Sequence, residues 1–412
     1  MSYVELKQRA PGCMRVLHVV EATVGGVRAY VQTIVTGLDQ SRFQFAVACP
    51  LRRQNAFGDD QFVSYLTGTG IPVWPVPMQR SISPVADAAA LFRLIAILRR
   101  EPFDIVHLHS SKAGFLGRLA AKMAGGAAVI YSPHGLSFLA DQGRAKRRLY
   151  LTLEQIAGRI CDRLIATSPS ECATIVGHGI APAGKVVCID LGIDPDPLPQ
   201  QFDRAAQRAA LGIPADAKVI GTLARAAAQK NPLLFVEAAA RVLASAPDAY
   251  FIWCGDGELR LAAEARAREH GIAARCHFLG HREDAQRVLA AFDLFWLTSD
   301  YESFGLATAE AMALKLPVVA TDVVGTCDVV VPGVTGILVP PRSPAALAQA
   351  TLALLGDSER AQAFGVAGRA RVLDRFTRDR MLDEVASLYQ SLIEPDRAEM
   401  SQRVASSSVT KV

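Results

Sequence analysis

Two glutamates with seven residues between them, Glu302 and Glu310, are the side chains whose type and spacing most clearly suit chemistry. They occur in the string FDLFWLTSDYESFGLATAEAMALKLPVVATD, which spans residues 292–322. A carboxylate can accept hydrogen bonds from both hydroxyls of a vicinal diol, as found on a ribose or a pyranose. Burying a glutamate among apolar neighbours is costly unless it has such a partner. On spacing alone, two solvated glutamates in an ordinary strand–helix crossover remain the simpler interpretation.

Local sequence signals predict how the chain positions this pair. Apolar runs of strand length span residues 292–297 and 318–321, and residues 306–314 between them are rich in good helix formers. Pro317 favours the end of that helix, because the residue before a proline avoids the helical region. The resulting order of strand, loop, helix and strand is that of a βαβ unit.

Ligands of parallel sheets bind beyond the carboxyl ends of the strands, where the loop that carries Glu302 would lie. Glu310 would lie on the helix just above that loop. The helix start near Ser303 and Gly305 would present free N–H groups and the positive end of the helix dipole, which suit a phosphate. One short unit could therefore bind a sugar, a phosphate and a ribose.

The string ESFGLATAEAMALKLPVVAT resembles the E-x7-E signature of the family 4 retaining glycosyltransferases, which have the GT-B fold. The resemblance implies that Glu302 and the backbone after it contact a donor sugar, and that Glu310 holds the ribose. The residues implied for the backbone contacts are Ser303, Phe304, Gly305 and Leu306. Ser303 departs from the family pattern, in which glycine is common.

In the second half of the chain, a predicted strand ends in a loop that carries Arg225 and Lys230. Asn231 and Pro232 suit the cap and the first position of the helix that follows. Two cations at a strand end can be ordinary surface charge. Their segment resembles the family's G-R-x4-K motif, with Ala224 in place of glycine, and the resemblance implies that both cations bind the distal phosphate of the donor.

Two further loops of this half follow predicted strands. Gly255 and Gly257 form a turn that can pass close to the nucleotide. Arg282 follows the next strand, near the place where the resemblance implies a contact with the base.

In the first half, residues 14–20 predict a strand, and Gly25 and Gly26 open a helix behind it. A tight turn explains these glycines on sequence alone, whereas the resemblance implies that they face the donor diphosphate across a cleft. His134 lies in the string S-P-H-G, which resembles the family's His-Gly loop, whose histidine faces the reacting sugar. The catalytic residues predicted in this way are His134, Arg225, Lys230 and Glu302.

A length of 412 residues predicts two domains. The predicted fold class is α/β of the GT-B type, with two Rossmann-like doubly wound domains facing an interdomain cleft. The predicted ranges are 1–195 for an acceptor-side domain, 196–375 for a nucleotide-sugar domain, 376–394 for a helix that crosses back and 395–412 for a disordered tail. The string DRLIATSPSE predicts the last strand of the first domain, and the proline-rich residues 185–199 predict the linker. Asp194 and Asp196 have D-x-D spacing, but their proline neighbours favour a turn over a metal site.

The composition of the chain bears on its location in the cell and on the charge of its partners. No apolar run reaches the roughly eighteen residues that cross a bilayer, and the N-terminus lacks the apolar core of a signal peptide. Eight scattered cysteines without C-x-x-C spacing indicate reduced thiols in a cytosolic protein. Residues 1–198 carry 21 Lys+Arg and 15 Asp+Glu, against 23 and 25 in the remainder. This small excess is as consistent with ordinary variation as with an anionic acceptor or membrane face.

A basic cluster heads a predicted amphipathic helix in the first half. Its members are Arg144, Lys146, Arg147 and Arg148. Such clusters commonly form a solvated face, and the alternative is docking to anionic lipid or to a lipid-pyrophosphate acceptor.

Together these patterns predict a retaining glycosyltransferase that moves a sugar from a nucleoside-diphosphate donor to an acceptor hydroxyl, in surface polysaccharide or lipid-linked oligosaccharide synthesis. The alternatives are a nucleotide-sugar epimerase on the same fold and a non-catalytic nucleotide-sugar binding protein. The expected partners are the nucleotide sugar, a saccharide or lipid-linked saccharide acceptor and an anionic membrane surface, and no nucleic acid. We expect no cofactor and no metal, and a cytoplasmic protein that is peripheral on the inner face of the membrane.

Overall fold

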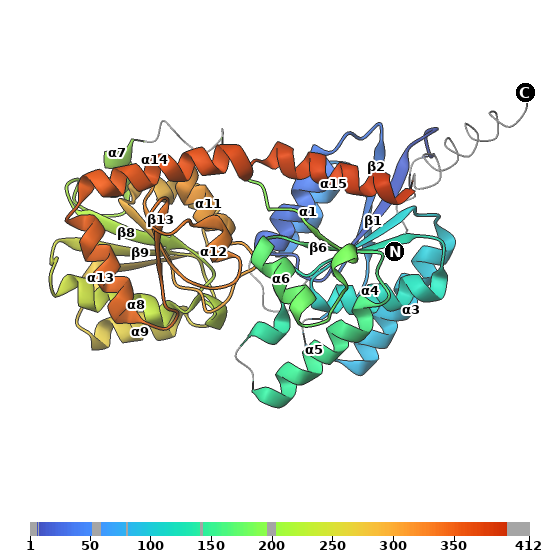
Figure 1. Cartoon of the computed structure of the whole chain (residues 1–412), viewed down its shortest axis with the longest axis horizontal. Coiled ribbons are helices and arrows are strands. Elements are labelled where there is room, and N and C mark those ends of the chain that lie inside the picture. Colours follow the sequence, from blue (N-terminus) through green and yellow to red (C-terminus); the bar gives the residue numbers. More distant parts are fainter. Residues whose placement is uncertain are drawn as a thin grey trace, which may run out of the picture.

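The structure is a computed structural model that describes residues 6, 8–51, 59–79, 81–140, 143–195 and 203–393. Within this part of the chain, two parallel sheets lie side by side with helices packed around them, and a C-terminal helix pair runs along both (Figure 1). The first sheet has seven strands in the order β3-β2-β1-β4-β5-β6-β7, and the second has six in the order β10-β9-β8-β11-β12-β13. Both sheets are doubly wound, as predicted.

The elements of the first domain follow one another in regular alternation. They are β1 Met14–Val20, α1 Gly25–Gly37, β2 Phe43–Cys49, α2 Asp59–Gly68, β3 Val73–Pro75, α3 Pro84–Arg100, β4 Ile105–His109, α4 Ser111–Ala124, β5 Ala128–Ser132, η1 Ser137–Leu139, α5 Arg144–Gly158, β6 Arg163–Ala166, α6 Pro169–Gly177, η2 Ala183–Lys185 and β7 Val186–Cys188.

The second domain repeats the alternation and adds the C-terminal helices. Its elements are α7 Arg204–Ala210, β8 Lys218–Leu223, η3 Ala228–Lys230, α8 Pro232–Leu243, β9 Ala249–Cys254, α9 Arg260–Glu269, η4 Ala273–Arg275, β10 Cys276–Gly280, α10 Ala285–Val288, η5 Leu289–Ala291, β11 Leu294–Leu297, α11 Leu306–Ala313, β12 Val318–Thr321, α12 Thr326–Val329, β13 Gly336–Val339, α13 Pro344–Leu355, α14 Ser358–Arg375 and α15 Arg378–Ile393. None of the helices in the described ranges is both long and apolar enough to span a bilayer.

The burial of the strands explains why each predicted strand is a continuous apolar run in the sequence. Helices on both faces bury a parallel sheet, and all seven residues of β1 are buried. The strand order reverses between β1 and β4 in the first sheet, and between β8 and β11 in the second. Ligands of doubly wound folds bind outside the carboxyl ends of the strands at such a reversal, so these two points locate the expected site.

The prediction that the string DRLIATSPSE forms the last strand of the first domain is wrong. β7 pairs in parallel with β6, with Val186 opposite Leu164, and lies inside the range predicted as linker. This three-residue edge strand is half-buried or exposed, so it lacks the apolar run that marks the other strands. Further along, Asp194 Oδ2 accepts a hydrogen bond from Arg378 Nη1 at 2.5 Å, and Asp196 lies outside the described residues.

The start of α15 is joined to the segment between the domains. Ile193 N donates to Phe376 O at 2.9 Å, and Arg378 N donates to Ile193 O at 2.7 Å. Further along the helix, Leu382 packs so closely on α1 that a Cβ at Gly37 would lie 2.6 Å from its Cδ1. The helix therefore fixes the second domain to the first, and the predicted tail at 395–412 lies outside the described residues.

Candidate active site

A cleft with a volume of about 2530 Å³ is lined by residues of both domains. Sites for one small ligand commonly have about 300–1,000 Å³, so this cleft has room for two substrates. All the predicted site residues except Phe304 line it. They are Gly25, Gly26, His134, Arg225, Lys230, Gly255, Gly257, Arg282, Glu302, Ser303, Gly305, Leu306 and Glu310.

An ion pair between Lys230 and Glu302 lies on the C-terminal wall of the cleft. Lys230 Nζ donates to Glu302 Oε1, and the same oxygen accepts a hydrogen bond from Ser299 Oγ at 2.6 Å. The Lys230 side chain is 22% exposed and that of Glu302 is 6% exposed. Glu302 is therefore held by two donors, while the ammonium group of Lys230 stays within reach of an anion in the cleft.

Further hydrogen bonds join the two loops that carry this pair. Asp300 N donates to Gln229 O at 2.8 Å, and Gln229 Nε2 donates to Tyr301 O at 3.0 Å. Thr298 Oγ1 donates to Lys230 O at 2.7 Å. Because β8 and β11 are neighbours in the sheet, the reversal point itself brings the loops together.

Glu310 lies half-buried on α11, one turn or more beyond the loop of Glu302. Gln286 Nε2 donates a hydrogen bond to its Oε1 at 3.0 Å. Removal from water raises the pKa of the Glu310 carboxyl, and the hydrogen bond from Gln286 opposes that shift. A diol that donates two hydrogen bonds to Glu310 would favour its charged form in the same way.

The raised pKa of Glu310 gives a prediction about pH. Its carboxylate takes up a proton at a higher pH than an ordinary glutamate does, and the protonated form accepts fewer hydrogen bonds from a diol. The KM for the donor should therefore rise as the pH falls from about 8 to about 5. Glu310→Gln should have a raised KM that stays constant over this range. A wild-type KM that does not change with pH would remove Glu310 from the diol site.

Helix α11 begins directly after the acidic loop. Its N-cap residue is Gly305, with φ 95°, which has no side chain to cap the first N–H groups. These groups can bind an anion. The ring of Phe304 is buried and packs edge-on against Phe376, with centroids 5.1 Å apart, so only the backbone of Phe304 can meet a ligand.

Close contact between two loops explains why residues 255 and 257 are glycines, which the sequence alone did not reveal. A Cβ on Gly255 would lie 2.1 Å from Ala224 O, and one on Gly257 would lie 2.4 Å from Ala226 O. The loop after β9 therefore runs against the loop after β8 and supports Arg225. Both glycines also line the cleft, so a close approach to a nucleotide stays a prediction.

One part of the cleft is bridged between the domains. Gln61 Nε2 donates to Glu283 Oε1 at 2.7 Å, and Arg28 Nη1 donates to Gln61 Oε1 at 3.1 Å. Next to Glu283, the guanidinium of Arg282 forms a two-bond ion pair with Asp284, in which both N–O distances are 2.8 Å. A ligand that binds the Arg282 guanidinium has to compete with Asp284 for its N–H groups. No sequence pattern indicated this ion pair or the bridge between the domains.

The N-terminal wall carries Gly25, Gly26 and His134. A Cβ on Gly26 would lie 3.5 Å from Leu306 Cδ1, so the walls approach closely here. His134 has φ 52°, which is uncommon for a residue with a side chain, and its Nε2 lies 3.0 Å from His109 Nδ1. Loss of surrounding water lowers the pKa of His134 to about 3, so the imidazole is neutral near pH 7 and a weak base.

The N-terminal wall also contains residues that sequence analysis did not assign to it. Phe115 of α4, and Lys146, Tyr150 and Leu153 of α5, line the cleft. The spacing of apolar residues predicts α5 as a helix, but it cannot show which of its faces borders a second domain.

Comparisons with known proteins agree with this geometry. A family model described as "Glycosyl transferases group 1" matches residues 203–371, and one described as "Glycosyl transferase 4-like domain" matches residues 25–192. The chain belongs to the group 1 glycosyltransferases. The family prediction is thereby confirmed on both sides of the cleft.

Two curated relatives show how far the similarity extends. The UDP-Gal:alpha-D-GlcNAc-diphosphoundecaprenol alpha-1,3-galactosyltransferase of Escherichia coli is 32% identical over 250 residues, which is 60% of this chain and 65% of that protein. The D-inositol 3-phosphate glycosyltransferase of Mycobacterium bovis is 34% identical over 268 residues, which is 62% of this chain and 54% of that protein. This group 1 chain thus spans less than two thirds of the length of either relative.

A solved structure confirms the predicted GT-B fold. Anabaena HepE, determined in complex with UDP and glucose, superposes with a TM-score of 0.77 at 22% identity, over 92% of this chain and 100% of that one. At this identity the likeness shows the shared architecture of two facing α/β domains.

Proposed function

We propose that this group 1 glycosyltransferase moves a sugar, with retention of anomeric configuration, from a nucleoside-diphosphate donor to an acceptor hydroxyl. The observation that carries the proposal is the C-terminal wall, where the Lys230–Glu302 pair, Glu310, Arg225 and the uncapped start of α11 line one cleft. Cations and N–H groups suit a diphosphate, and carboxylates suit the sugar hydroxyls.

The chemistry follows from where charge develops. The bond between the anomeric carbon and the diphosphate oxygen breaks, a bond from that carbon to the acceptor oxygen forms, and negative charge grows on the departing phosphate. Arg225 offers a bidentate fork, Lys230 a point charge and α11 its N–H donors. The lowered pKa of His134 makes its imidazole a weak base near pH 7, so we assign the acceptor proton to the departing phosphate.

We propose that this chemistry proceeds without a divalent metal, because Arg225 and Lys230 both line the cleft and supply two positive charges that can neutralise a diphosphate. The test is turnover in excess EDTA, which should equal turnover with added Mg²⁺. A requirement for Mg²⁺ would show that the two cations are insufficient.

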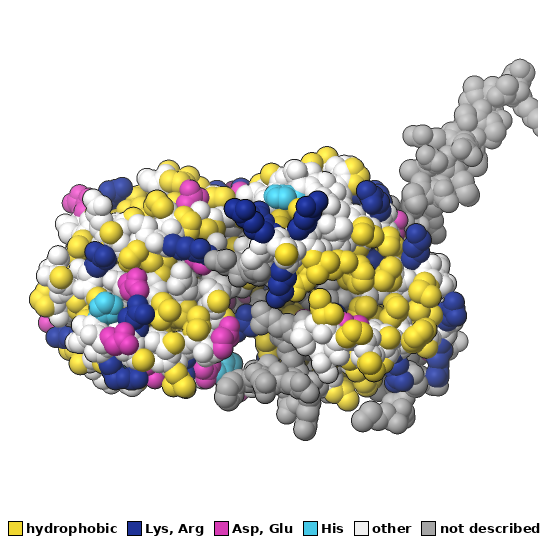
Figure 2. Space-filling view, turned by 90° about the horizontal axis from the view of Figure 1, so that it is seen from below, with side chains coloured by type: hydrophobic (Ala, Val, Ile, Leu, Met, Phe, Trp, Pro, Cys, Tyr) yellow, Lys and Arg dark blue, Asp and Glu magenta, His cyan; other side chains and the backbone are white. Residues whose placement is uncertain are grey.

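We further propose that the acceptor is carried on a lipid. The cleft wall from the first domain is apolar at Phe115, Tyr150 and Leu153. The same domain also exposes large apolar side chains on its surface, namely Ile82, Val85, Phe92, Leu149 and Ile156. In the view from below, hydrophobic side chains cover much of this domain, with Lys and Arg side chains among them (Figure 2). The name of the Escherichia coli relative specifies an acceptor of this type, a saccharide on diphosphoundecaprenol.

The start of α5 supports an anionic partner at this surface. Its first two turns hold Arg144, Lys146, Arg147 and Arg148, all exposed, and no acidic residue lies in its first turn. Cations are unfavourable at a helix N-terminus, which already carries the positive end of the dipole, so the arrangement is stabilised when an anion is near. An anionic bilayer supplies such charge beside an apolar layer.

Charge reversal on α5 tests whether the start of this helix binds an anionic membrane. Arg147→Glu/Arg148→Glu should weaken co-sedimentation with phosphatidylglycerol-containing vesicles by more than about tenfold, since each cation near the surface contributes about 1 kcal/mol. The control Arg241→Glu/Arg268→Glu makes the same change of charge at exposed positions of the second domain and should bind vesicles like the wild type. Equal losses in both variants would mean that net charge, and not this surface, governs binding.

The activity itself is tested by nucleotide release from a panel of UDP-, GDP- and ADP-sugars, with and without a lipid-linked saccharide. Release that depends on the acceptor, together with a glycosylated lipid product, is the expected result. Conversion of the sugar without acceptor would identify an epimerase, and binding without either reaction would identify a binding protein.

A further inference from the structure

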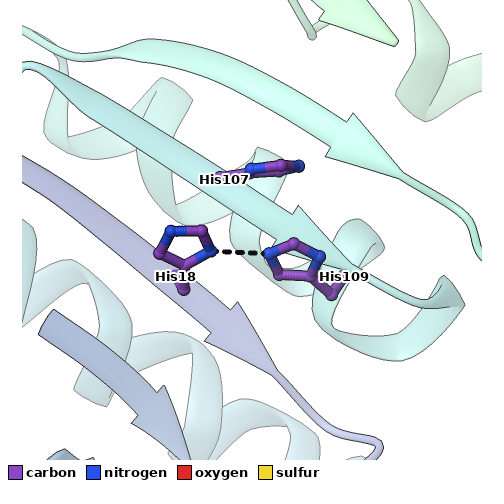
Figure 3. Close-up of side chains that lie close together, drawn as sticks. All are labelled: His18, His107 and His109. Carbon is purple, nitrogen blue, oxygen red and sulfur yellow. Dashed lines mark hydrogen bonds between the residues drawn. The ribbon is translucent and has the colours of Figure 1, made fainter. Parts of the chain in front are cut away.

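Three histidines form a hydrogen-bonded series that starts in the core and ends at the cleft. His18 on β1 and His109 on β4 are fully buried, and His18 Nδ1 lies 2.9 Å from His109 Nε2 (Figure 3). His109 Nδ1 lies 3.0 Å from Nε2 of His134, which lines the cleft. The rings of neighbouring members are nearly parallel, with angles of 11° and 18° between them. We call this series the histidine chain.

The histidine chain can carry its protons in only two arrangements. Burial lowers the pKa of His18 to about 3, like that of His134, and lowers the pKa of His109 well below its usual range, so all three are neutral near pH 7. A neutral imidazole has one N–H and one acceptor nitrogen. If His109 donates on one side, it must accept on the other, so both hydrogen bonds point in the same direction.

The buried end of the chain distinguishes the two directions. His18 Nε2 is buried and has no hydrogen-bond partner in the described part of the protein. If the hydrogen bonds run towards the core, this atom carries a buried N–H with no acceptor. If they run towards the cleft, it carries only a lone pair. Unpaired buried N–H groups are the rarer of the two in proteins, so the direction towards the cleft is favoured.

A metal ion is the alternative for the buried part of this cluster. His18, His107 and His109 bring ring nitrogens within 4.8 Å of one another. However, both ring nitrogens of His107 have other partners, with Tyr389 Oη at 2.6 Å and Ser132 Oγ at 2.8 Å. A cation bound to His107 would have to displace one of these two hydrogen-bond partners.

We propose that His18 and His109 are positioning residues that hold His134 in the tautomer protonated on Nδ1. In this state His134 Nε2 accepts from His109, and Nδ1–H is left to donate to an oxygen of the bound sugar nucleotide. His134 is then a fixed hydrogen-bond donor at the cleft. The tautomer does not depend on the proposed function, whereas the identity of the oxygen that accepts its hydrogen bond does.

The tautomer is tested directly by long-range ¹H–¹⁵N correlation spectra of the full-length protein labelled with ¹⁵N-histidine, without any substrate. In the wild type, His134 should show a protonated Nδ1 and an unprotonated Nε2. In His109→Phe, which keeps an aromatic ring but removes both ring nitrogens, His134 should lose this fixed state. His107→Phe is the matched control, because His107 is equally buried on the same strand but outside the histidine chain, and it should leave the His134 signals unchanged.

Two spectra would overturn the proposal. One is a wild-type His134 that is protonated on Nε2. The other is a shift of the His18, His107 and His109 signals on addition of one equivalent of Zn²⁺. Because these readouts need no turnover, they can fail while the glycosyltransferase activity stands, or succeed while it fails.

A double-mutant cycle tests the consequence for turnover, once the donor is known. His109→Phe should lower kcat/KM about tenfold in the wild-type background and have no further effect in the His134→Ala background, because it acts through His134. Equal losses in both backgrounds would indicate that His109 only supports the fold, and would contradict its positioning role. Thermal unfolding of each variant establishes that the proteins compared are folded.

Discussion

Lys230→Ala should turn over its donor ~10²–10³-fold more slowly than the wild type, which corresponds to about 2.7–4 kcal/mol of transition-state stabilisation. The reason is that Lys230 pairs with Glu302 in the cleft and, in the function we propose, supplies positive charge to the departing phosphate. Without the ammonium group, that charge has one donor fewer, and Glu302 is left with the hydrogen bond from Ser299. The loss should appear in kcat, since the interaction is strongest in the transition state.

The matched control for Lys230 is on the same strand–loop unit. Lys218 lies exposed at the opposite end of β8, and Lys218→Ala removes the same charge without touching the cleft. It should leave kcat within about twofold of the wild type. A Lys230→Ala protein that keeps most of its turnover while remaining folded would contradict the role of Lys230.

Arg118→Met should destabilise the protein by about 3–5 kcal/mol, because it leaves a buried carboxylate without its cation. Arg118 is fully buried, and its Nη2 lies 2.9 Å from Glu154 Oε2. Glu154 also accepts from Tyr131 Oη at 2.8 Å, and the guanidinium lies 4.0 Å from the centre of the Tyr131 ring. This triad joins α4 and α5 at the N-terminal wall of the cleft, which Glu154 also lines, so its loss should also loosen that wall.

Two comparisons make the stability prediction specific. The Arg266 side chain is 37% exposed and pairs with Glu237, which is 38% exposed, and with Glu269. Arg266→Met breaks both pairs and should change the free energy of unfolding by less than about 1 kcal/mol. Arg118→Met/Glu154→Leu removes both buried charges and should be more stable than Arg118→Met alone. A similar small loss for Arg118→Met and Arg266→Met in urea unfolding would show that burial does not strengthen the pair.

Local signals in the sequence were sufficient where one segment determines its own structure. Asn231 and Pro232 predict the start of α8, and in the structure the Asn231 side chain accepts from Leu234 N at 3.1 Å. The apolar run at 318–321 coincides with β12. β7 was missed because three residues at a sheet edge are too few, and too exposed, to form an apolar run.

Contacts between residues far apart in the chain could not be predicted from local sequence signals. Lys230 and Glu302 are 72 positions apart, and their pairing depends on the adjacency of β8 and β11. Family resemblance placed both at one site without predicting that they bind each other. The histidine chain likewise depends on β1, β4 and β5 being neighbours in the sheet, an order that local periodicity does not determine.

Calorimetric titration with UDP, GDP and ADP tests the proposal that the C-terminal wall of the cleft binds a nucleoside diphosphate. At least one of the three should bind at a single site per chain, and its affinity should fall in Lys230→Ala but not in Lys218→Ala. A folded wild-type protein that binds none of these nucleoside diphosphates would rule out this binding site.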